Sequence, residues 1–531
     1  MAAKQKILIT EEISDKAIDF LKTDFEVDIK KQIPKSELRD IIKNYDALII
    51  KNKTKVTSEV INNTDRLKVI GKVGANIDNI DIKSATLKGI YVINAPFSHI
   101  VSTAELTIAF IFSLAKRLNF VSQITKTENM EDKQKLKGVE LEGKTLSILG
   151  LGQIGSLVAK KALSLGVNVV AYDPYVSDDK FWQLGIKKAV NLYDAFKDSD
   201  FVSIHLPKTK ETIGLVNKEV IKDMKKGSFL INMSKSGVVV EEDLYEFIKN
   251  GHLSGAAIDF FEIDQMKNSK LFGIEEVICT PRMRGSTIEA LRKSSIEIAE
   301  QIKKVLEDEI PTNVVNLPSY TQEIIDASKP FIELCNDLGS LFSQLFEHKV
   351  EELEISYVGK VANLKTEFLT SIILIKILER ESKQRINLVN LNLICEERGL
   401  KVNEIKNPTP QDYLNLISLK GRGENFELSV SGTITGIKNN PLFIGIDKFE
   451  INMVPSKYMA FISYKDIPGQ IGKIGTAFGE LGVNIAAMHV GRKTIGGEAL
   501  MGLNLDCEVN DEMLEEFKKK SGFSKIKIIN L

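Results

Sequence analysis

Short apolar runs alternate with helical segments along the first part of the chain. Runs rich in β-branched residues lie at residues 6–10, 46–50, 67–73 and 91–96. Their alternation with helical spacing predicts a parallel sheet with crossover helices. A long apolar helix, with hydroxyl side chains available as caps at its start, is predicted over residues 102–117 and leads into a second unit.

That second unit contains six further strand candidates between Leu146 and Pro281, with the sequences LSILG, VNVVAYD, FVSIHLP, SFLINM, GAAIDFF and VICTP. A charged amphipathic helix then leads to Pro311, where turn residues mark a boundary. A third unit is predicted from Pro318 to Val454. From Tyr458, a strand–turn–helix–strand order with a glycine-rich hairpin predicts a small α+β module.

The composition is that of a multidomain globular protein. A chain of 531 residues is too long for one core, and 43% hydrophobic with 27% charged side chains match globular proteins. The formal net charge of −1 leaves no excess for binding nucleic acid or an anionic membrane surface. Because no apolar signal region or membrane-length run is present, we expect a cytoplasmic protein with neither partner.

The four cysteines indicate no metal site and no disulfide framework. They are widely separated and show no CxxC spacing, and all four are expected to be ordinary small apolar residues. They are Cys279, Cys335, Cys395 and Cys507.

The strongest local signal is a glycine motif between a strand and a helix. Gly150 allows a tight turn, Gly152 lets a pyrophosphate approach the backbone, and Gly155 allows close helix–sheet packing. Asp173 ends the next strand, where a carboxylate accepts hydrogen bonds from a ribose diol and repels a 2′-phosphate. We therefore expect NAD as cofactor, rather than NADP. Free N–H groups at the helix start would face the phosphates, at Gln153 and Ile154.

In addition to this motif, blocks such as GKVGANIDNID, NAPFSHIVSTAELTIA, VSIHLPKTKETIGLVN, TPRMRGST and DIPGQIGKIGTAFGELGVNIAA follow one another along the chain. In them the chain resembles the NAD-dependent D-2-hydroxyacid dehydrogenases, in particular the long-form D-3-phosphoglycerate dehydrogenases. The resemblance implies oxidation of a small anionic 2-hydroxy acid, 3-phosphoglycerate, to 3-phosphohydroxypyruvate in L-serine biosynthesis.

The resemblance also implies an α/β architecture of four domains in a homotetramer. These are a split flavodoxin-like substrate domain (residues 1–100 and 290–315), an inserted Rossmann NAD-binding domain (101–289), an α+β intervening regulatory domain (316–454) and a C-terminal ACT domain (455–531). An L-serine effector would bind between paired ACT domains. Asp466 and Asn484 match the effector positions, with turn and strand-end roles as the alternative.

Further site positions follow only from the resemblance. Cofactor contacts are implied for His205, Pro207, Asn232 and Asp259, the last with the nicotinamide carboxamide. Contacts with the substrate are implied for Lys51, Lys72, Asn76 and His99.

All three catalytic positions of the family carry another residue in this chain. The family's arginine, glutamate and histidine fall on Lys235, Asp264 and Arg282. Asp264 keeps the carboxylate and Lys235 keeps the charge without the bidentate fork. Arg282 has no acceptor and cannot shuttle protons near neutrality, so it is not the general base.

Three interpretations stay open. In the first, the chain is a dehydrogenase whose base is Lys235 or His99. In the second, it is an NAD-binding paralogue without turnover that acts as a sensor or regulatory subunit. In the third, a different, multiply anionic substrate is held by five cationic side chains. Those cations are Lys51, Lys72, Lys235, Arg282 and Arg284.

Overall fold

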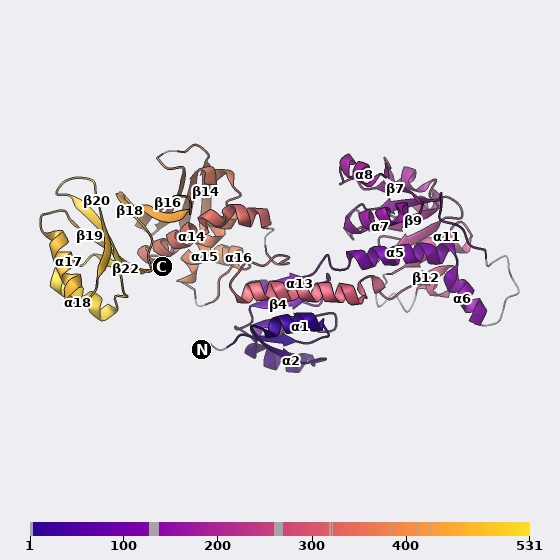
Figure 1. Cartoon of the computed structure of the whole chain (residues 1–531), viewed down its shortest axis with the longest axis horizontal. Coiled ribbons are helices and arrows are strands. Elements are labelled where there is room, and N and C mark those ends of the chain that lie inside the picture. Colours follow the sequence, from indigo (N-terminus) through magenta and orange to yellow (C-terminus); the bar gives the residue numbers. More distant parts are fainter. Residues whose placement is uncertain are drawn as a thin grey trace.

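A computed structural model describes residues 4–126, 137–259, 269–317, 320, 322–382, 384–410, 412–424 and 426–531. It contains four sheets, each in a lobe of its own (Figure 1). The chain crosses from the first lobe to the second and returns through the long helix α13 before it enters the third and fourth. No helix in these ranges is long and apolar enough to span a membrane.

The first sheet has five parallel strands in the order β2-β1-β3-β4-β5, which is the flavodoxin-like order. Apolar side chains fill both of its faces. The strands are β1 (Lys6–Ile9), β2 (Glu26–Ile29), β3 (Ala47–Ile50), β4 (Val69–Lys72) and β5 (Tyr91–Asn94). The helices are α1 (Asp15–Lys22), α2 (Lys35–Ile41), α3 (Ser58–Asn62) and α4 (Ile82–Leu87), with a 3-10 turn η1 (Ile42–Asn44).

Helix α13 (Ile288–Leu306) returns to this sheet and covers one of its faces. Its apolar stripe, which includes Ile298 and Ile302, is fully buried against β1, β4 and α1. Gly71 on β4 makes this contact possible, because a Cβ there would lie 2.5 Å from Cγ2 of Ile298. The predicted amphipathic helix thus completes the first lobe.

The second sheet has seven parallel strands in the order β12-β11-β10-β9-β6-β7-β8. Six of them confirm the six strand candidates, and the short β8 was not predicted. The strands are β6 (Thr145–Leu149), β7 (Asn168–Tyr172), β8 (Lys187–Lys188), β9 (Phe201–Ile204), β10 (Phe229–Asn232), β11 (Gly255–Ile258) and β12 (Val277–Cys279). The order reverses between β6 and β9, the place where such sheets bind nucleotides.

Helices cover both faces of the second sheet. They are α5 (Ile100–Ala115), α6 (Leu118–Lys126), α7 (Gln153–Leu163), α8 (Asp178–Leu184), α9 (Leu192–Phe196), α10 (Lys218–Lys222) and α11 (Glu241–Lys249), with 3-10 turns η2 (Lys270–Gly273) and η3 (Met283–Gly285). The predicted hydroxyl caps of the apolar helix were wrong in position. Helix α5 begins at Ile100, and the Ser102 hydroxyl donates to the Arg284 carbonyl instead.

The third sheet is mixed, with the order β14-β13-β15-β16-β17-β18, and only the β13–β14 pair is parallel. Helices α14 (Gln322–Leu345) and α15 (Glu367–Glu379) share a large core with it. The other elements are α16 (Leu391–Arg398), η4 (Lys360–Asn363), β13 (Glu352–Gly359), β14 (Lys401–Asn407), β15 (Asn415–Gly423), β16 (Phe426–Thr435), β17 (Asn440–Ile446) and β18 (Phe449–Met453).

The fourth sheet is antiparallel, with the order β20-β21-β19-β22. The β-α-β-β-α-β sequence of elements confirms the predicted α+β module. The elements are β19 (Tyr458–Lys465), α17 (Gln470–Glu480), β20 (Ile485–Arg492), β21 (Glu498–Leu505), α18 (Asp511–Ser521) and β22 (Ile526–Asn530).

We predict that Gly71→Ala destabilises the first lobe, because the new methyl group would overlap the α13 side chains. Overpacking of a core costs about 1–3 kcal/mol, and chemical denaturation of the full chain would measure the loss. As a control, Gly475→Ala lies in α17 with open space around it. That variant should be neutral or slightly stabilising, and an equal loss in both variants would contradict the prediction.

Candidate active site

The glycine loop between β6 and α7 has the geometry of a phosphate cradle. Gly150 has φ +87° and lies so close to the His205 carbonyl that a Cβ would be 2.9 Å from it. A Cβ on Gly155 would be 2.1 Å from the Gly150 carbonyl oxygen, whereas one on Gly152 would meet nothing within 4 Å. The first and third glycines therefore fix the turn, and Gly152 leaves the start of α7 open to a ligand.

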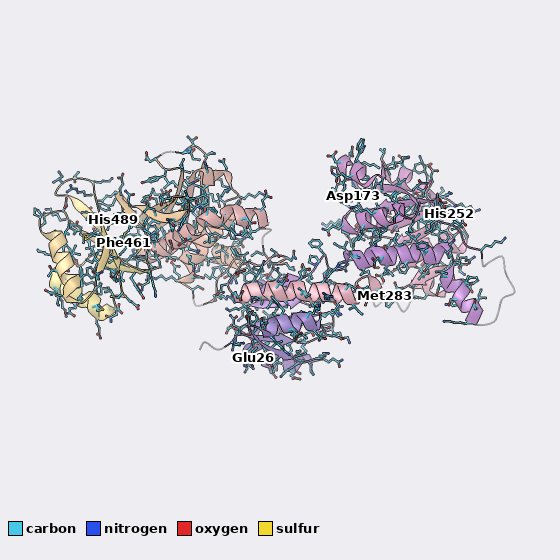
Figure 2. All side chains as sticks on the ribbon, in the orientation of Figure 1. Glu26, Asp173, His252, Met283, Phe461 and His489 are labelled. Carbon is cyan, nitrogen blue, oxygen red and sulfur yellow. The ribbon has the colours of Figure 1, made fainter. Side chains whose placement is uncertain are left out.

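Asp173 links the end of β7 to this loop. One carboxylate oxygen accepts from the Leu151 N–H at 2.8 Å, and the other accepts from the Tyr175 N–H at 3.0 Å. Each oxygen keeps a second acceptor site, so the carboxylate is positioned for a ribose diol by the loop that would hold the pyrophosphate. This arrangement fits a bound dinucleotide. Figure 2 shows that Asp173 and Met283, a residue of the loop after β12, lie on the same lobe.

The ends of β9 and β10 are tied together by side-chain hydrogen bonds. The Ser234 hydroxyl accepts from the Leu206 N–H at 2.9 Å, and the Asn232 side chain accepts from the Ser234 N–H at 3.0 Å. His205 lies beside them, with Nε2 2.8 Å from the Ser203 hydroxyl and Nδ1 buried without a described partner. Burial, and then the Arg284 charge, lower the pKa of His205 to about 3, so this ring is neutral at physiological pH.

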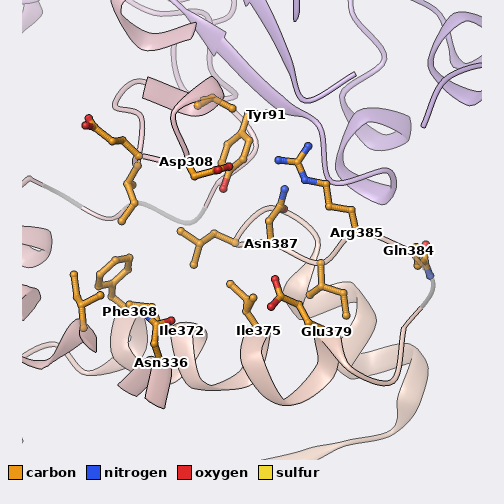
Figure 3. Close-up of a pocket in the computed structure, with 16 residues that line it drawn as sticks. Tyr91, Asp308, Asn336, Phe368, Ile372, Ile375, Glu379, Gln384, Arg385 and Asn387 are labelled. Carbon is orange, nitrogen blue, oxygen red and sulfur yellow. The ribbon is translucent and has the colours of Figure 1, made fainter. Parts of the chain in front are cut away.

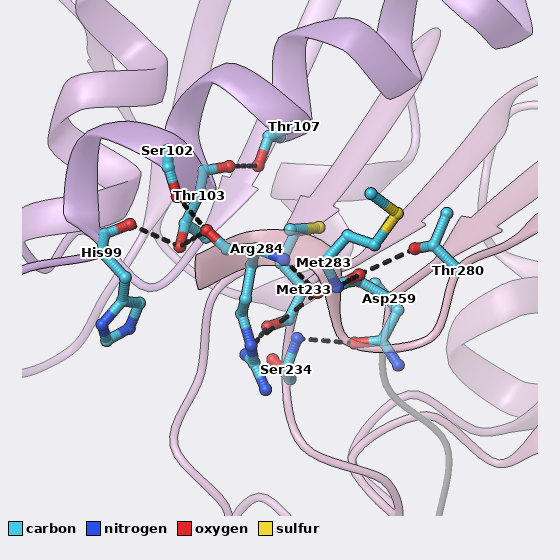
Figure 4. Close-up of polar contacts among 11 residues, drawn as sticks. His99, Ser102, Thr103, Thr107, Met233, Ser234, Asp259, Thr280, Met283 and Arg284 are labelled. Atoms are coloured by element: carbon cyan, nitrogen blue, oxygen red, sulfur yellow. Dashed lines mark hydrogen bonds and ion pairs between the residues drawn. The ribbon is translucent and has the colours of Figure 1, made fainter. Parts of the chain in front are cut away.

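Asp259 organises the loop that follows β12. Its side chain is fully buried and accepts from the Thr280 hydroxyl at 2.7 Å and from the N–H groups of Met283 and Arg284 at 2.6 and 3.1 Å (Figure 4). Its backbone carbonyl also accepts from the Arg282 N–H. Asp259 thus fixes the backbone that carries Arg282 and Arg284.

The two arginines of this loop have different environments. Arg282 is exposed, and its backbone is left-handed, with φ 56° and ψ 54°. Arg284 is mostly buried and donates from its guanidinium to the Met233 carbonyl at 2.7 Å, while Nε lies 3.8 Å from the Asp259 carboxylate. Its own carbonyl accepts from Ser102 and Thr103 of α5. Arg284 is therefore a fixed positive charge between β10, β11 and α5.

His99 lies at the start of α5 on the other side of this charge. Burial, and then the charge of Arg284, lower the pKa of His99 below its usual 6.5. A Cβ on Gly285 would be 3.6 Å from the His99 Cβ, so the loop after β12 reaches this residue. Within the described ranges no group hydrogen-bonds to its ring, which leaves a neutral imidazole free to accept a proton.

Lys72, the last residue of β4, is bonded to the loop that follows β3 and begins at Lys51. The Lys72 side chain is 1% exposed, and its ammonium donates to the Lys51 carbonyl and, at 2.8 Å, to the Asn52 side chain. Glu11, which the sequence did not single out, accepts from the N–H groups of residues 51–54. Among the five cations, Lys72 therefore has a structural role, because its ammonium holds this loop.

The remaining candidates are less enclosed. Lys235 and Asn76 are exposed, and Pro207 is exposed in the turn after β9. Asp264 lies outside the described residues. No group of three potential metal-binding side chains occurs within the ranges that the structure describes.

The two effector positions lie at opposite ends of the fourth sheet. Asp466 follows β19 and pairs with Arg492 at 3.0 Å, whereas Asn484 precedes β20 and bonds to Asp506 at 2.6 Å. A strand of eight residues, such as β20, spans about 27 Å. One chain by itself therefore does not bring these two side chains together.

Comparison with known proteins decides the family. Residues 108–283 match the D-isomer specific 2-hydroxyacid dehydrogenase NAD binding domain, residues 327–447 the D-3-phosphoglycerate dehydrogenase intervening domain, and residues 458–522 the ACT domain. D-3-phosphoglycerate dehydrogenase of Methanocaldococcus jannaschii is 36% identical over 526 residues, covering 99% of this chain and 100% of that protein. The chain belongs to the D-3-phosphoglycerate dehydrogenase family.

Other members and solved structures agree with this assignment. D-3-phosphoglycerate dehydrogenase of Bacillus subtilis is 33% identical, covering 99% of each chain. The crystal structure of the TT0316 protein from Thermus thermophilus covers 59% of this chain and 100% of its own, with 29% identity and a TM-score of 0.53. As in the NAD-binding domain of its family, the glycine loop and Asp173 are present, so NAD is the cofactor.

We predict that Asp173→Ala weakens NADH binding by at least about tenfold, because it removes ribose acceptors and the anchor of the Leu151 N–H. Fluorescence titration of the full chain with NADH would measure the change. Asp178→Ala is the matched control, since that carboxylate is exposed and pairs only with Lys188 in the described structure. Unchanged affinity in Asp173→Ala would contradict the cofactor site.

We also predict a pH effect from Lys72. Burial lowers the pKa of Lys72 to about 8, compared with about 10.4 in an unfolded chain. Between these values the unfolded chain holds a proton that the folded chain has lost, so the Lys72 contribution to stability rises with pH from about 8 to 10. Lys72→Met should remove this rise, whereas the exposed control Lys53→Met should keep it. Denaturation at several pH values would compare the slopes, and equal slopes would contradict the burial of this ammonium.

Proposed function

We propose that this chain is an active NAD-dependent dehydrogenase that interconverts 3-phosphoglycerate and 3-phosphohydroxypyruvate. The observation that carries the proposal is the position of the His99 ring, which lies at the start of α5 next to the loop of Arg284 and has no hydrogen-bond partner within the described residues. Burial, and then the Arg284 charge, lower its pKa. A neutral imidazole can accept a proton, which the guanidinium of Arg282 cannot. The curated relatives that match the whole chain are named D-3-phosphoglycerate dehydrogenase.

In this mechanism His99 accepts the hydroxyl proton of the substrate as the hydride leaves its carbon. NAD, held by the glycine loop and Asp173, supplies the hydride acceptor. The positive charges of Arg284, Arg282 and Lys235 attract the substrate carboxylate and phosphate and favour the developing carbonyl dipole. Burial, and then the charge of Arg284, lower the pKa of His99, which favours the unprotonated base near neutral pH.

The domain limits and assembly belong to the same proposal. The substrate domain would comprise residues 1–100 and 290–315, followed in the assignment by a Rossmann domain (101–289), an intervening domain (316–454) and an ACT domain (455–531). The ACT domain would bind L-serine between two copies of the chain. The separation of Asp466 from Asn484 supports this arrangement, because a partner chain could bring the two positions together in a homotetramer of the cytoplasm.

The first test is reduction of 3-phosphohydroxypyruvate by the purified protein, followed by the loss of NADH absorbance. Saturable turnover is the expected result. No turnover in a sample that binds NADH would contradict the proposal.

The role of the base is tested by substitution. His99→Asn should lower kcat by about 10²–10⁴-fold and remove the acid limb of the pH profile, whose midpoint should lie below 6.5 because the pKa of His99 is lowered. Lys235→Met should mainly raise KM, because it removes a charge that attracts the substrate. An unchanged kcat in His99→Asn would show that the base is another group. A larger loss of kcat in Lys235→Met than in His99→Asn would assign the base to Lys235.

One observation supports the second candidate, an NAD-binding paralogue that senses rather than turns over. The Asp259 carboxylate, which the family resemblance assigns to the nicotinamide, is fully buried and already accepts three hydrogen bonds. Under this alternative, NADH would bind with no turnover of any 2-oxo acid.

A further inference from the structure

A cavity lies where the first and third lobes meet, far along the chain from the glycine loop. Its volume is about 540 Å³, within the usual range of small-molecule sites. The first lobe contributes Tyr91 at the start of β5 and Asp308 after α13, and the third lobe contributes Arg385 and the α15 surface (Figure 3). Two lobes, built from different segments of the chain, therefore form the walls of this cavity.

One wall of the cavity carries polar groups whose bonding capacity is not used. The Tyr91 hydroxyl, the Asp308 carboxylate and the Arg385 guanidinium have no hydrogen-bond or ion-pair partner in the part of the chain that the structure describes. Burial raises the pKa of Tyr91 to about 12, with Arg385 and Asp308 acting on it in opposite directions, so the phenol lies within the fields of both charges. A cation and a carboxylate thus flank one hydroxyl donor.

The facing wall is mostly apolar. Phe368, Ile372 and Ile375 of α15 line it, opposite Tyr91 and Asp308 in Figure 3, and two polar side chains, Asn336 and Glu379, lie beside them. A ligand that matches both walls has a carboxylate for Arg385, an ammonium for Asp308 and an apolar side chain for α15. We propose that this cavity binds an apolar α-amino acid.

The cavity is connected both to the contact between the first and third lobes and to the segment that carries His99. Asn387, two residues after Arg385, donates to the Gly89 carbonyl at 2.7 Å, so the same loop joins the third lobe to the first. Strand β5 runs from Tyr91 to Asn94 and leads to the segment that carries His99. An occupant would contact both lobes at this junction. Binding at this cavity can be measured without turnover.

Calorimetric titration of the full chain with L-leucine tests the proposal. Two compounds serve as half-ligands: 4-methylpentanoate lacks the ammonium, and 3-methylbutylamine lacks the carboxylate. We expect saturable L-leucine binding and at least about tenfold weaker binding of both half-ligands. Equal affinity for 4-methylpentanoate would overturn the amino-acid assignment in favour of a simple anion site, and absence of saturable binding would overturn the site itself.

Variants locate the binding. Arg385→Met and Asp308→Asn should each weaken L-leucine binding at least about tenfold, and Tyr91→Phe by a few-fold. The matched control Arg380→Met lies on the same lobe outside the lining and should leave binding unchanged. Binding should also persist in Asp466→Ala combined with Asn484→Ala, which separates this cavity from the ACT positions. Loss of binding in that double variant would overturn the proposal. Unchanged binding in Arg385→Met would also overturn it.

Discussion

The candidate active site depends on the hydrogen bonds that the buried Asp259 carboxylate accepts. This carboxylate accepts from Thr280 and from two backbone N–H groups of the next loop, and so fixes the path of the chain between β12 and α13. A buried charge without such partners would be very costly. The same loop then docks on the first turn of α5, where the Arg284 carbonyl accepts from the Ser102 hydroxyl, close to His99 at the start of that helix.

The positive charge of Arg284 follows from this arrangement. Its guanidinium donates to the Met233 carbonyl and lies near Asp259, which orients the charge toward the ends of β10 and β11. Both nearby histidines respond, because burial and this charge together lower the pKa of His99 and of His205. Two histidines with lowered pKa values therefore lie near the loop that carries Arg284.

Two charged side chains of the first lobe, Lys72 and Glu11, serve to hold a loop. Lys72 and Glu11 are both used to hold the segment at residues 51–54, one through its ammonium and the other through its carboxylate. Hydrogen bonds from that backbone lower the pKa of Glu11, although burial alone would raise it. These two charges shape a loop, whereas the charge of Arg284 acts on neighbouring side chains.

The sequence by itself predicted most strands of the first two lobes and the α+β fold of the fourth, but neither β8 nor the elements of the third lobe. The spacing of apolar residues predicted the two parallel sheets and the α+β module, and the Gly150–Gly155 motif with Asp173 predicted the nucleotide cradle, because backbone sterics act over a few residues. The tertiary structure alone decided where charged side chains lie. Lys72 and Arg284 looked alike as cations in the sequence, yet one holds a loop and the other, together with burial, lowers the pKa of His99. Burial and charge neighbours arise from residues far apart in the chain, such as Asp259 and Arg284, and no local pattern encodes them.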